Sequence, residues 1–243
     1  YIMDKITYLD HSGFMIETSK MLLVFDYFRD PAHEVTKTLR GNDELPVVFF
    51  VSHNHHDHFN HEIFNLGQNH KRVYVISNDI IYRNDNLALP VSWVSPGDSL
   101  EGLPGGIKVR TYGTTGKGCA FIVTTADGRI IFHAGELGEP VDHNDKALRD
   151  AAHYRERFET AVGRIAADQT AFDIAMMAVD TNDGPDFAMG ATKMLEAVKV
   201  GNFVPYHTDD SSDRACNFAS YPFTENVDTR IICLTRPGES ATF

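Results

Sequence analysis

Short apolar stretches separated by polar turns fill the first half of the chain and predict a β-rich unit. Residues 2–9, 13–18 and 21–27 alternate or run apolar, as expected for the opening antiparallel strands of a sheet. Ala126-Asp127-Gly128 has the composition of a hairpin turn between two such strands. The remaining strands are predicted at 46–51, 72–77, 91–95, 107–112, 119–125 and 129–132.

The second half of the chain changes to helical periodicity. Residues 144–168 place apolar side chains three and four positions apart with charged residues between them, which predicts a long amphipathic helix. Residues 187–198 follow the same pattern. Strands are predicted at 172–179, 202–206 and 231–234.

The order of the elements indicates the fold class. A short helix is predicted from Asp30 to about Arg40, because Asp is a favourable cap and Pro31 suits the first turn. Hairpins outnumber βαβ units in the first half, which favours a four-layer αββα sandwich over an ordinary three-layer α/β fold. With 243 residues, of which 42% are hydrophobic and 23% charged, the whole chain 1–243 is expected to form a single domain.

Charge and cysteine content narrow the classes of function. Lys and Arg number 22 against 34 Asp and Glu, and the net charge of −12 repels phosphate backbones, which argues against a nucleic-acid partner. No apolar run approaches a membrane span and residues 1–10 lack signal-peptide order, so we expect no membrane partner and a cytoplasmic location. Cys119, Cys216 and Cys233 lack metal-ligand spacing and are expected to be reduced, packed thiols, with a catalytic cysteine as the less favoured alternative.

Candidate chemistry is concentrated directly after the apolar stretch 46–51. Four of the 12 histidines fall within residues 53–58. Neutral imidazole and carboxylate together suit Zn, Mn, Fe or Ni, so this segment is a candidate metal site. The alternative interpretation is a solvated histidine-rich turn or an adventitious metal-binding tract. The pattern His-x-His-x-Asp-His is formed by His53, His55, Asp57 and His58.

This motif, placed after an apolar strand, resembles the signature of the metallo-β-lactamase-fold hydrolases. The resemblance implies an αββα fold with a first metal held by His53 and His55 and a second held by the other two motif residues. Residues 11–14 (His-Ser-Gly-Phe), followed by 24–26 (Val-Phe-Asp), resemble the entry of the ascorbate-6-phosphate-lactonase-like branch. That branch places a histidine near the metal pocket, so His11 is either a site residue or a hydrogen-bonded structural histidine.

Two further ligands are expected from the same resemblance. Glu136 stands where the family has an aspartate that bridges two metals, and its longer side chain keeps the charge while moving the oxygens. The alternative for Glu136 is a surface carboxylate after a turn. His207 follows a short strand and matches the last metal-binding histidine of the family. His133 is expected to orient a ligand by a hydrogen bond rather than to bind metal directly.

The loop 113–118 departs from the family pattern, because most of the superfamily carries a metal-binding histidine there and this chain has none. A similar Gly-Ser-Thr-rich loop, followed by a strand and His-Ala-Gly-Asp, occurs in a bacterial group of predicted metal-dependent hydrolases. Thr114 and Lys117 of this loop are expected to meet an anionic group of the substrate. The alternative for both is a solvated glycine-rich turn.

The implied function is that of a metal-dependent hydrolase. A divalent ion with an open position lowers the pKa of bound water from about 15.7 towards 7, and the resulting hydroxide attacks a small ester, lactone or phosphoester. Asp57 is the expected catalytic residue, which orients the nucleophile and carries a proton to the leaving group. One or two ions are expected, zinc first, with manganese, iron or nickel as alternatives.

Two other functions compete with this one, and the oligomeric state is open. The missing histidine and the glutamate at position 136 motivate a catalytically weak sensor or scaffold with a degenerate metal site. A nucleic-acid-processing hydrolase is disfavoured by the acidic charge. The expected partner is a small-molecule substrate, anionic in one version of the hypothesis, and a homo-oligomer is compatible with the sequence.

Overall fold

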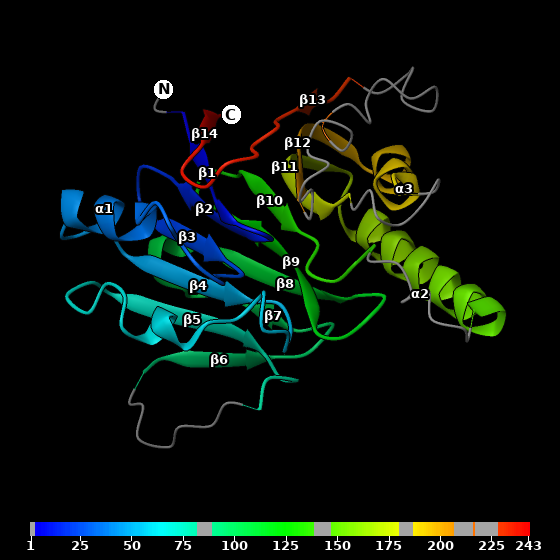
Figure 1. The fold of residues 1–243 in the computed structure, drawn as a ribbon, viewed down its shortest axis with the longest axis horizontal. Coiled ribbons are helices and arrows are strands. Elements are labelled where there is room, and N and C mark those ends of the chain that lie inside the picture. The colour runs from blue at the N-terminus through cyan, green and yellow to red at the C-terminus, as the bar shows by residue number, and fades with distance from the viewer. Residues whose placement is uncertain (1–2, 82–88, 139–146, 180–186, 207–215, 217–227) are drawn as a thin grey trace.

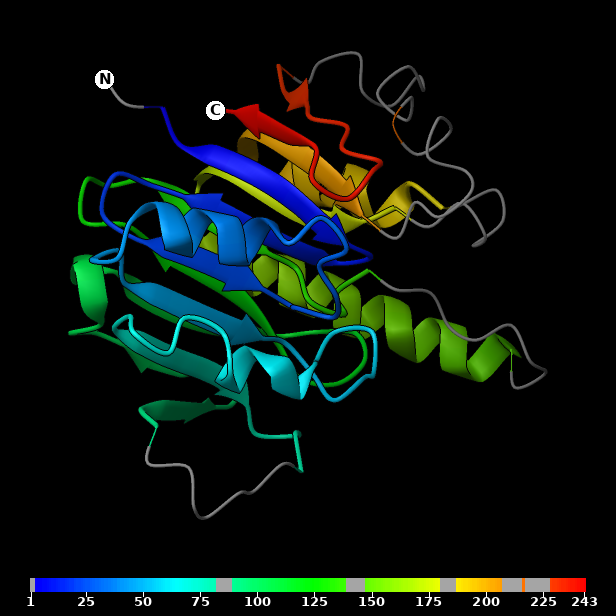
Figure 2. The same cartoon turned by 60° about the vertical axis from the view of Figure 1, so that its left-hand side comes forward.

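The computed structural model describes residues 3–81, 89–138, 147–179, 187–206, 216 and 228–243. Two seven-stranded sheets stack face to face, and helices cover their outer faces (Figures 1 and 2). This arrangement confirms the predicted αββα sandwich. The assignment of residues 1–243 to one domain stays a prediction.

The first sheet has the order β14-β1-β2-β3-β4-β5-β6. Pairing is antiparallel from β14 to β3 and parallel from β3 to β6, so β3, β4 and β5 end at the same edge. The strands are β1 Lys5–Asp10, β2 Gly13–Glu17, β3 Leu22–Phe25, β4 Val47–Val51, β5 Arg72–Ser77, β6 Val91–Val94 and β14 Ser240–Thr242.

The second sheet has the order β13-β12-β11-β10-β9-β8-β7. Its strands are β7 Ser99–Leu100, β8 Lys108–Gly113, β9 Cys119–Thr124, β10 Ile130–His133, β11 Ala171–Ala178, β12 Lys199–Tyr206 and β13 Arg230–Ile231. The helices are α1 Glu34–Gly41, α2 Ala147–Asp168 and α3 Met189–Ala197, with 3₁₀ turns at His61–Phe64 and Pro104–Gly106.

The uninterrupted apolar sequence of β4 is explained by burial on both faces. Val48 and Phe50 point into the core between the sheets, whereas Phe49 and its alternate neighbours point into the layer under α1. The Phe50 ring stacks on that of Phe25 at 4.6 Å and approaches Phe121 of the facing sheet at 5.4 Å. A strand with polar alternation would leave unpaired polar groups in one of these layers.

The helices of the second half bury the face that their sequence pattern predicts. Phe158, Val162 and Ile165 of α2 lie in one cluster with Phe132 and Phe172 of the second sheet. Their spacing of three and four residues places them on one side of the helix. Of the described helices, α2 is the longest and is amphipathic, and none has an apolar stretch sufficient to span a bilayer.

The structure corrects two expectations from the sequence. The first helix begins at Glu34 rather than near Asp30, although the Asp30 carboxylate accepts a hydrogen bond from the Val35 amide at 2.9 Å. Cys216 and Cys233 form a disulfide, so the expectation of three reduced thiols is wrong. The pairing depends on tertiary proximity, with Cα atoms 5.5 Å apart, which spacing along the chain does not reveal. Cys119 is buried, and burial raises the pKa of its thiol to about 12.

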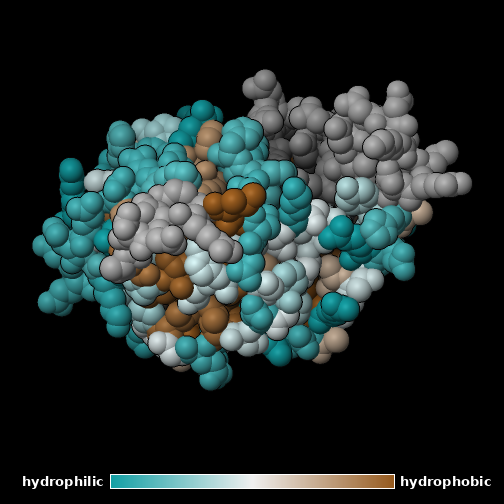
Figure 3. Space-filling view, turned by 90° about the horizontal axis from the view of Figure 1, so that it is seen from below, coloured by the Kyte–Doolittle hydropathy of each residue, from teal (hydrophilic) through white to brown (hydrophobic). Residues whose placement is uncertain are grey.

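Strand β6 forms one edge of the first sheet, and exposed apolar side chains lie on it and near it. Trp93 of this strand is 40% exposed and the nearby Ile81 is 86% exposed. Figure 3, which views the molecule from below, shows apolar surface gathered within a mainly polar face. A homo-oligomer stays a prediction.

Candidate metal centre

Loops from both sheets meet at the edge where β3, β4 and β5 end. Loop 52–58 follows β4, and Asp26 follows β3 directly. From the second sheet come loop 113–118 after β8 and residues 134–136 after β10. The Cys119 amide donates to the Ser52 carbonyl at 2.8 Å, which ties the start of the histidine loop to the second sheet. The carboxyl edge of parallel strands is the usual place for ligand-binding loops in α/β proteins.

Asp26 is the buried anchor of the histidine loop. Its carboxylate is fully buried and accepts hydrogen bonds from the Ser52 amide at 2.7 Å, the Ser52 hydroxyl at 2.5 Å and His58 Nδ1 at 2.7 Å. Burial acts to raise the pKa of Asp26, but interactions with His133 and His58 outweigh it and hold the pKa well below its usual range. Asp26 therefore stays ionised, and its hydrogen bonds orient the side chains of Ser52 and His58.

This network assigns the ring protons of two histidines. Because the Ser52 hydroxyl donates to Asp26, its oxygen accepts from His53 Nδ1 at 2.8 Å. His58 donates through Nδ1 to the same carboxylate. Burial, followed by the proximity of His58, lowers the pKa of His53 to about 3, so His53 is neutral at pH 7. His53 then presents an unprotonated Nε2, which is the form that binds a metal, and the bond from His58 Nδ1 to Asp26 sets the orientation of the His58 ring.

One group of donors has the geometry of a single metal site. His53 Nε2 lies 3.0 Å from His55 Nδ1, and Glu136 Oε1 lies 3.8 Å and 3.5 Å from these two atoms. Tetrahedral bonds of about 2.0–2.2 Å place ligand atoms roughly 3.3–3.6 Å apart. The three measured distances, 3.0, 3.5 and 3.8 Å, lie on both sides of this spacing, so small side-chain shifts are needed for the three donors to hold one divalent ion. The His55 side chain is 45% exposed, so this group is accessible from solvent.

A second group lies beside the first. Donor atoms of His11, Asp57 and His58 lie within 4.8 Å of one another, and His11 Nε2 is 2.8 Å from Asp57 Oδ2. Burial acts to raise the pKa of Asp57, but the hydrogen bond from His11 and the proximity of His58 outweigh it and lower the pKa. His207 lies outside the described residues. Within the described residues Glu136 groups with the first pair of histidines, and its bridging role stays a prediction.

Loop 113–118 holds the Glu136 carboxylate. The Lys117 amide donates to Glu136 Oε2, and the Thr115 hydroxyl donates to the Glu136 carbonyl at 2.8 Å. A Cβ on Gly116 would lie 1.9 Å from Glu136 Oε2. Gly118 has φ of +73°, and a Cβ there would lie 1.9 Å from the Ser52 carbonyl oxygen. The glycines let the loop approach both the carboxylate and the histidine loop.

We expect Gly116→Ala to weaken binding of the first ion about tenfold or more, because the new methyl group displaces Glu136 from His55. Competition with a chromogenic chelator measures the dissociation constant. Gly163→Ala on α2 is the matched control, since its Cβ meets nothing within 4 Å. An unchanged affinity in Gly116→Ala would contradict the role assigned to this loop.

The remaining predicted residues hold the surrounding backbone. The fully buried His133 ring lies between Phe25 and Tyr206, at 5.2 Å and 5.5 Å. It donates through Nε2 to the Ser12 carbonyl at 3.2 Å and accepts from the Gly135 amide at 3.2 Å. These bonds hold the backbone at Ser12, before β2, and at Gly135, directly before Glu136.

Thr114 and Lys117 contribute through the loop itself. The Thr114 hydroxyl donates to the Lys117 carbonyl at 2.8 Å, so it is used within the turn. The Lys117 amide binds Glu136, while its side chain is exposed. Contact of either side chain with a substrate anion stays a prediction.

Sequence reasoning missed Asp26 and Ser52 as site residues. A signal for Asp26 was present, because it is a carboxylate directly after a wholly apolar strand, the same context as the histidine loop. Ser52 gave no signal of its own. Its role depends on the position of Asp26 across the sheet.

Comparison with known proteins shows the family of the chain. Residues 5–152 match the family described as the beta-lactamase superfamily domain. The chain belongs to the β-lactamase superfamily. It is 25% identical to a UPF0173 metal-dependent hydrolase of Pelotomaculum thermopropionicum over 213 residues, which make up 81% of this chain and 79% of that protein. The comparison confirms the expected enzyme class, a metal-dependent hydrolase of the superfamily.

Solved structures of the superfamily share the fold. Igni18, a metallo hydrolase of Ignicoccus hospitalis, superposes with a TM-score of 0.69 at 16% identity and covers 100% of this chain and 99% of its own. The metallo-beta-lactamase fold protein YhfI of Bacillus subtilis superposes with a TM-score of 0.60 at 13% identity, covering 98% and 99%.

Proposed function

We propose that this superfamily member hydrolyses a small ester, lactone or phosphoester at the edge formed by loops 52–58, 113–118 and 134–136. The observation that supports it most directly is the convergence of His53 Nε2, His55 Nδ1 and Glu136 Oε1 within 3.8 Å. A divalent ion bound there supplies Lewis acidity towards the scissile group and towards water. Zinc matches the nitrogen and oxygen donor set, and manganese, iron and nickel remain alternatives.

The chain's own groups determine where the reaction takes place. Asp57 is ionised and sits at the rim with a side chain 24% exposed, so its carboxylate can accept a hydrogen bond from the attacking water and orient it. Transfer of the water proton through Asp57 to the leaving group is part of the proposal. His11 fixes this carboxylate through the 2.8 Å contact. The substrate approaches from the side of His55, the exposed member of the first donor group.

The test is a hydrolysis panel with metal-free protein and with protein reloaded with zinc, manganese, iron or nickel. Nitrophenyl esters, a small lactone and nitrophenyl phosphoesters represent the three substrate classes. We expect turnover of at least one class, dependent on the metal and absent in His53→Ala. No metal-dependent turnover, combined with a change in oligomeric state on metal loading, would overturn the proposal in favour of a sensor.

A further inference from the structure

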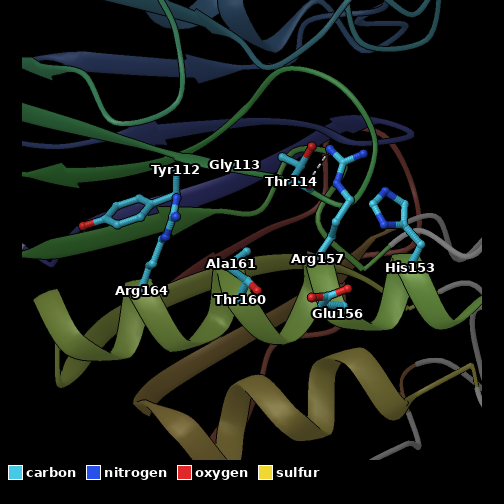
Figure 4. A pocket seen from close by; sticks show the side chains of 9 residues that line it. All are labelled: Tyr112, Gly113, Thr114, His153, Glu156, Arg157, Thr160, Ala161 and Arg164. Carbon is cyan, nitrogen blue, oxygen red and sulfur yellow. Dashed lines mark hydrogen bonds between the residues drawn. The ribbon is translucent and has the colours of Figure 1, made fainter.

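A groove lies between α2 and the end of β8, beside the loop that holds Glu136 (Figure 4). Its volume is about 340 Å³, at the lower end of the range for small-molecule sites. Tyr112 and the start of loop 113–118 form one wall, and the other is one face of α2. A second cavity of about 260 Å³ shares Tyr112, Gly113 and Arg164 and extends the groove along the helix.

The first cavity is lined by two arginines and a single carboxylate, although the chain has a net charge of −12. These are Arg157, Arg164 and Glu156, whereas the second cavity adds Arg110 with the carboxylates of Asp98 and Asp168. Arg157 and Arg164 are two turns apart on α2 with Thr160 between them, so the side chains share one face of the helix.

The two arginines differ from other cations of this region in their ion pairing. Arg110 pairs with Asp168 at 3.4 Å, and Lys193 pairs with Glu159 at 2.7 Å. Within the described residues no carboxylate lies within 4.0 Å of Arg157 or Arg164. Unpaired guanidinium groups on a groove are the side chains that bind phosphate or carboxylate through paired N–H donors.

Arg157 also connects the groove to the metal centre. Its Nη2 donates to the Thr114 carbonyl at 3.2 Å and to the Gly116 carbonyl at 2.8 Å, the first of which is drawn in Figure 4. Gly116 in turn packs against the Glu136 carboxylate. The Nε and Nη1 donors of Arg157 have no hydrogen-bond partner in the described part of the chain, and can bind a ligand.

We propose that this groove is an effector site for the phosphate or carboxylate group of a small molecule, coupled to the metal centre through Arg157 and Gly116. An anion in the groove attracts the Arg157 guanidinium and weakens its hold on the two loop carbonyls. The loop then fixes Glu136 less firmly, and the first ion binds less tightly. This regulation goes beyond the hydrolase function and does not depend on the substrate.

Binding is tested with sulfate on metal-free protein, so that the anion has no ion to bind at the histidines. The unfolding midpoint is followed against sodium sulfate, with sodium chloride at equal ionic strength as reference. We expect a saturable rise in the midpoint for the wild type. In Arg164→Ala the apparent sulfate affinity should fall about tenfold, because charge-assisted hydrogen bonds are lost.

The matched control is Arg155→Ala, which removes the same charge from the same helix without lining the groove. It should bind sulfate with the affinity of the wild type. The comparison of the two variants distinguishes specific sulfate binding in the groove from the general stabilisation of folded proteins by sulfate. Acetate distinguishes the ligand class: saturable acetate binding that depends on Arg164 indicates a carboxylate, and sulfate binding alone indicates a tetrahedral anion. Unsaturable effects, or equal sulfate affinity in Arg164→Ala, would overturn the site.

Coupling is tested by the zinc dissociation constant, measured by chelator competition with and without sulfate. Sulfate should weaken zinc binding at least about fivefold in the wild type and in Arg155→Ala, and leave Arg164→Ala unchanged. Zinc loading must weaken sulfate binding by the same factor, because the coupling is reciprocal. A zinc dissociation constant that does not change with sulfate in the wild type would overturn the coupling, whatever the outcome of the hydrolysis panel.

Discussion

Asp57→Ala is expected to lower kcat/KM by about a hundredfold to ten-thousandfold while the fold is retained. The carboxylate is ionised because the hydrogen bond from His11 and the proximity of His58 outweigh the effect of burial on its pKa. Alanine removes both the charge and the proton acceptor. Steady-state kinetics on the best substrate of the hydrolysis panel measure the loss, and circular dichroism with thermal unfolding checks the fold.

Two companion variants make this result specific to the carboxylate. Asp57→Asn keeps the shape but removes the charge, so it should lose activity to a similar extent. His56→Ala alters the same loop at a side chain that is 90% exposed and belongs to none of the donor groups. The 3.8 Å contact of His56 Nδ1 with Asp57 Oδ1 is screened by solvent, so this variant should retain both metal and turnover. Retained activity in Asp57→Ala would contradict the mechanism.

The sandwich could be predicted because burial on both faces leaves a record in the sequence. β4 is apolar at every position, and the hairpin between β9 and β10 has a turn signal. The short strands β7 and β14 have no apolar pattern from which a strand could be predicted. Ser240–Thr242 is partly polar and exposed, and it becomes a strand by pairing with β1, which lies more than two hundred residues earlier in the chain.

The candidate site was predictable where its residues are close in sequence. His53, His55, Asp57 and His58 share one loop, so their common chemistry is visible in the chain. The role of Asp26 depends instead on register: Phe25 of β3 pairs with Phe50 of β4, which brings the residue that follows β3 beside the start of the histidine loop. Such a contact is set by strand pairing and not by local pattern.

The absence of a histidine from loop 113–118 also has a structural explanation. The loop donates its Lys117 amide to Glu136, and Gly116 and Gly118 approach the carboxylate and Ser52 more closely than any side chain would allow. The longer glutamate reaches towards His53 and His55 from this position. The sequence showed the departure from the family pattern, whereas the compensating contact needed coordinates.

Removing the metal should lower the unfolding midpoint by roughly 8–16 °C. An ion present at about a thousand times its dissociation constant stabilises the folded state by about 4 kcal/mol, and in a chain of this size each kcal/mol corresponds to roughly 2–4 °C. The effect is large because His53, His55 and Glu136 are brought within 3.8 Å only by the fold. Differential scanning calorimetry with and without chelator measures the shift.

Two variants, His53→Ala and His56→Ala, test whether this stabilisation comes from a metal ion at the proposed centre. His53→Ala should abolish most of the difference between loaded and metal-free protein, because its Nε2 belongs to the first donor group with His55 and Glu136. His56→Ala should keep the full shift. Elemental analysis then gives the number of ions bound per chain. Two ions support a dinuclear centre that includes the His11, Asp57 and His58 group. A single ion that is lost in His53→Ala limits metal binding to the first group. An unfolding midpoint that does not respond to chelator would contradict a tightly held ion at this edge of the sandwich.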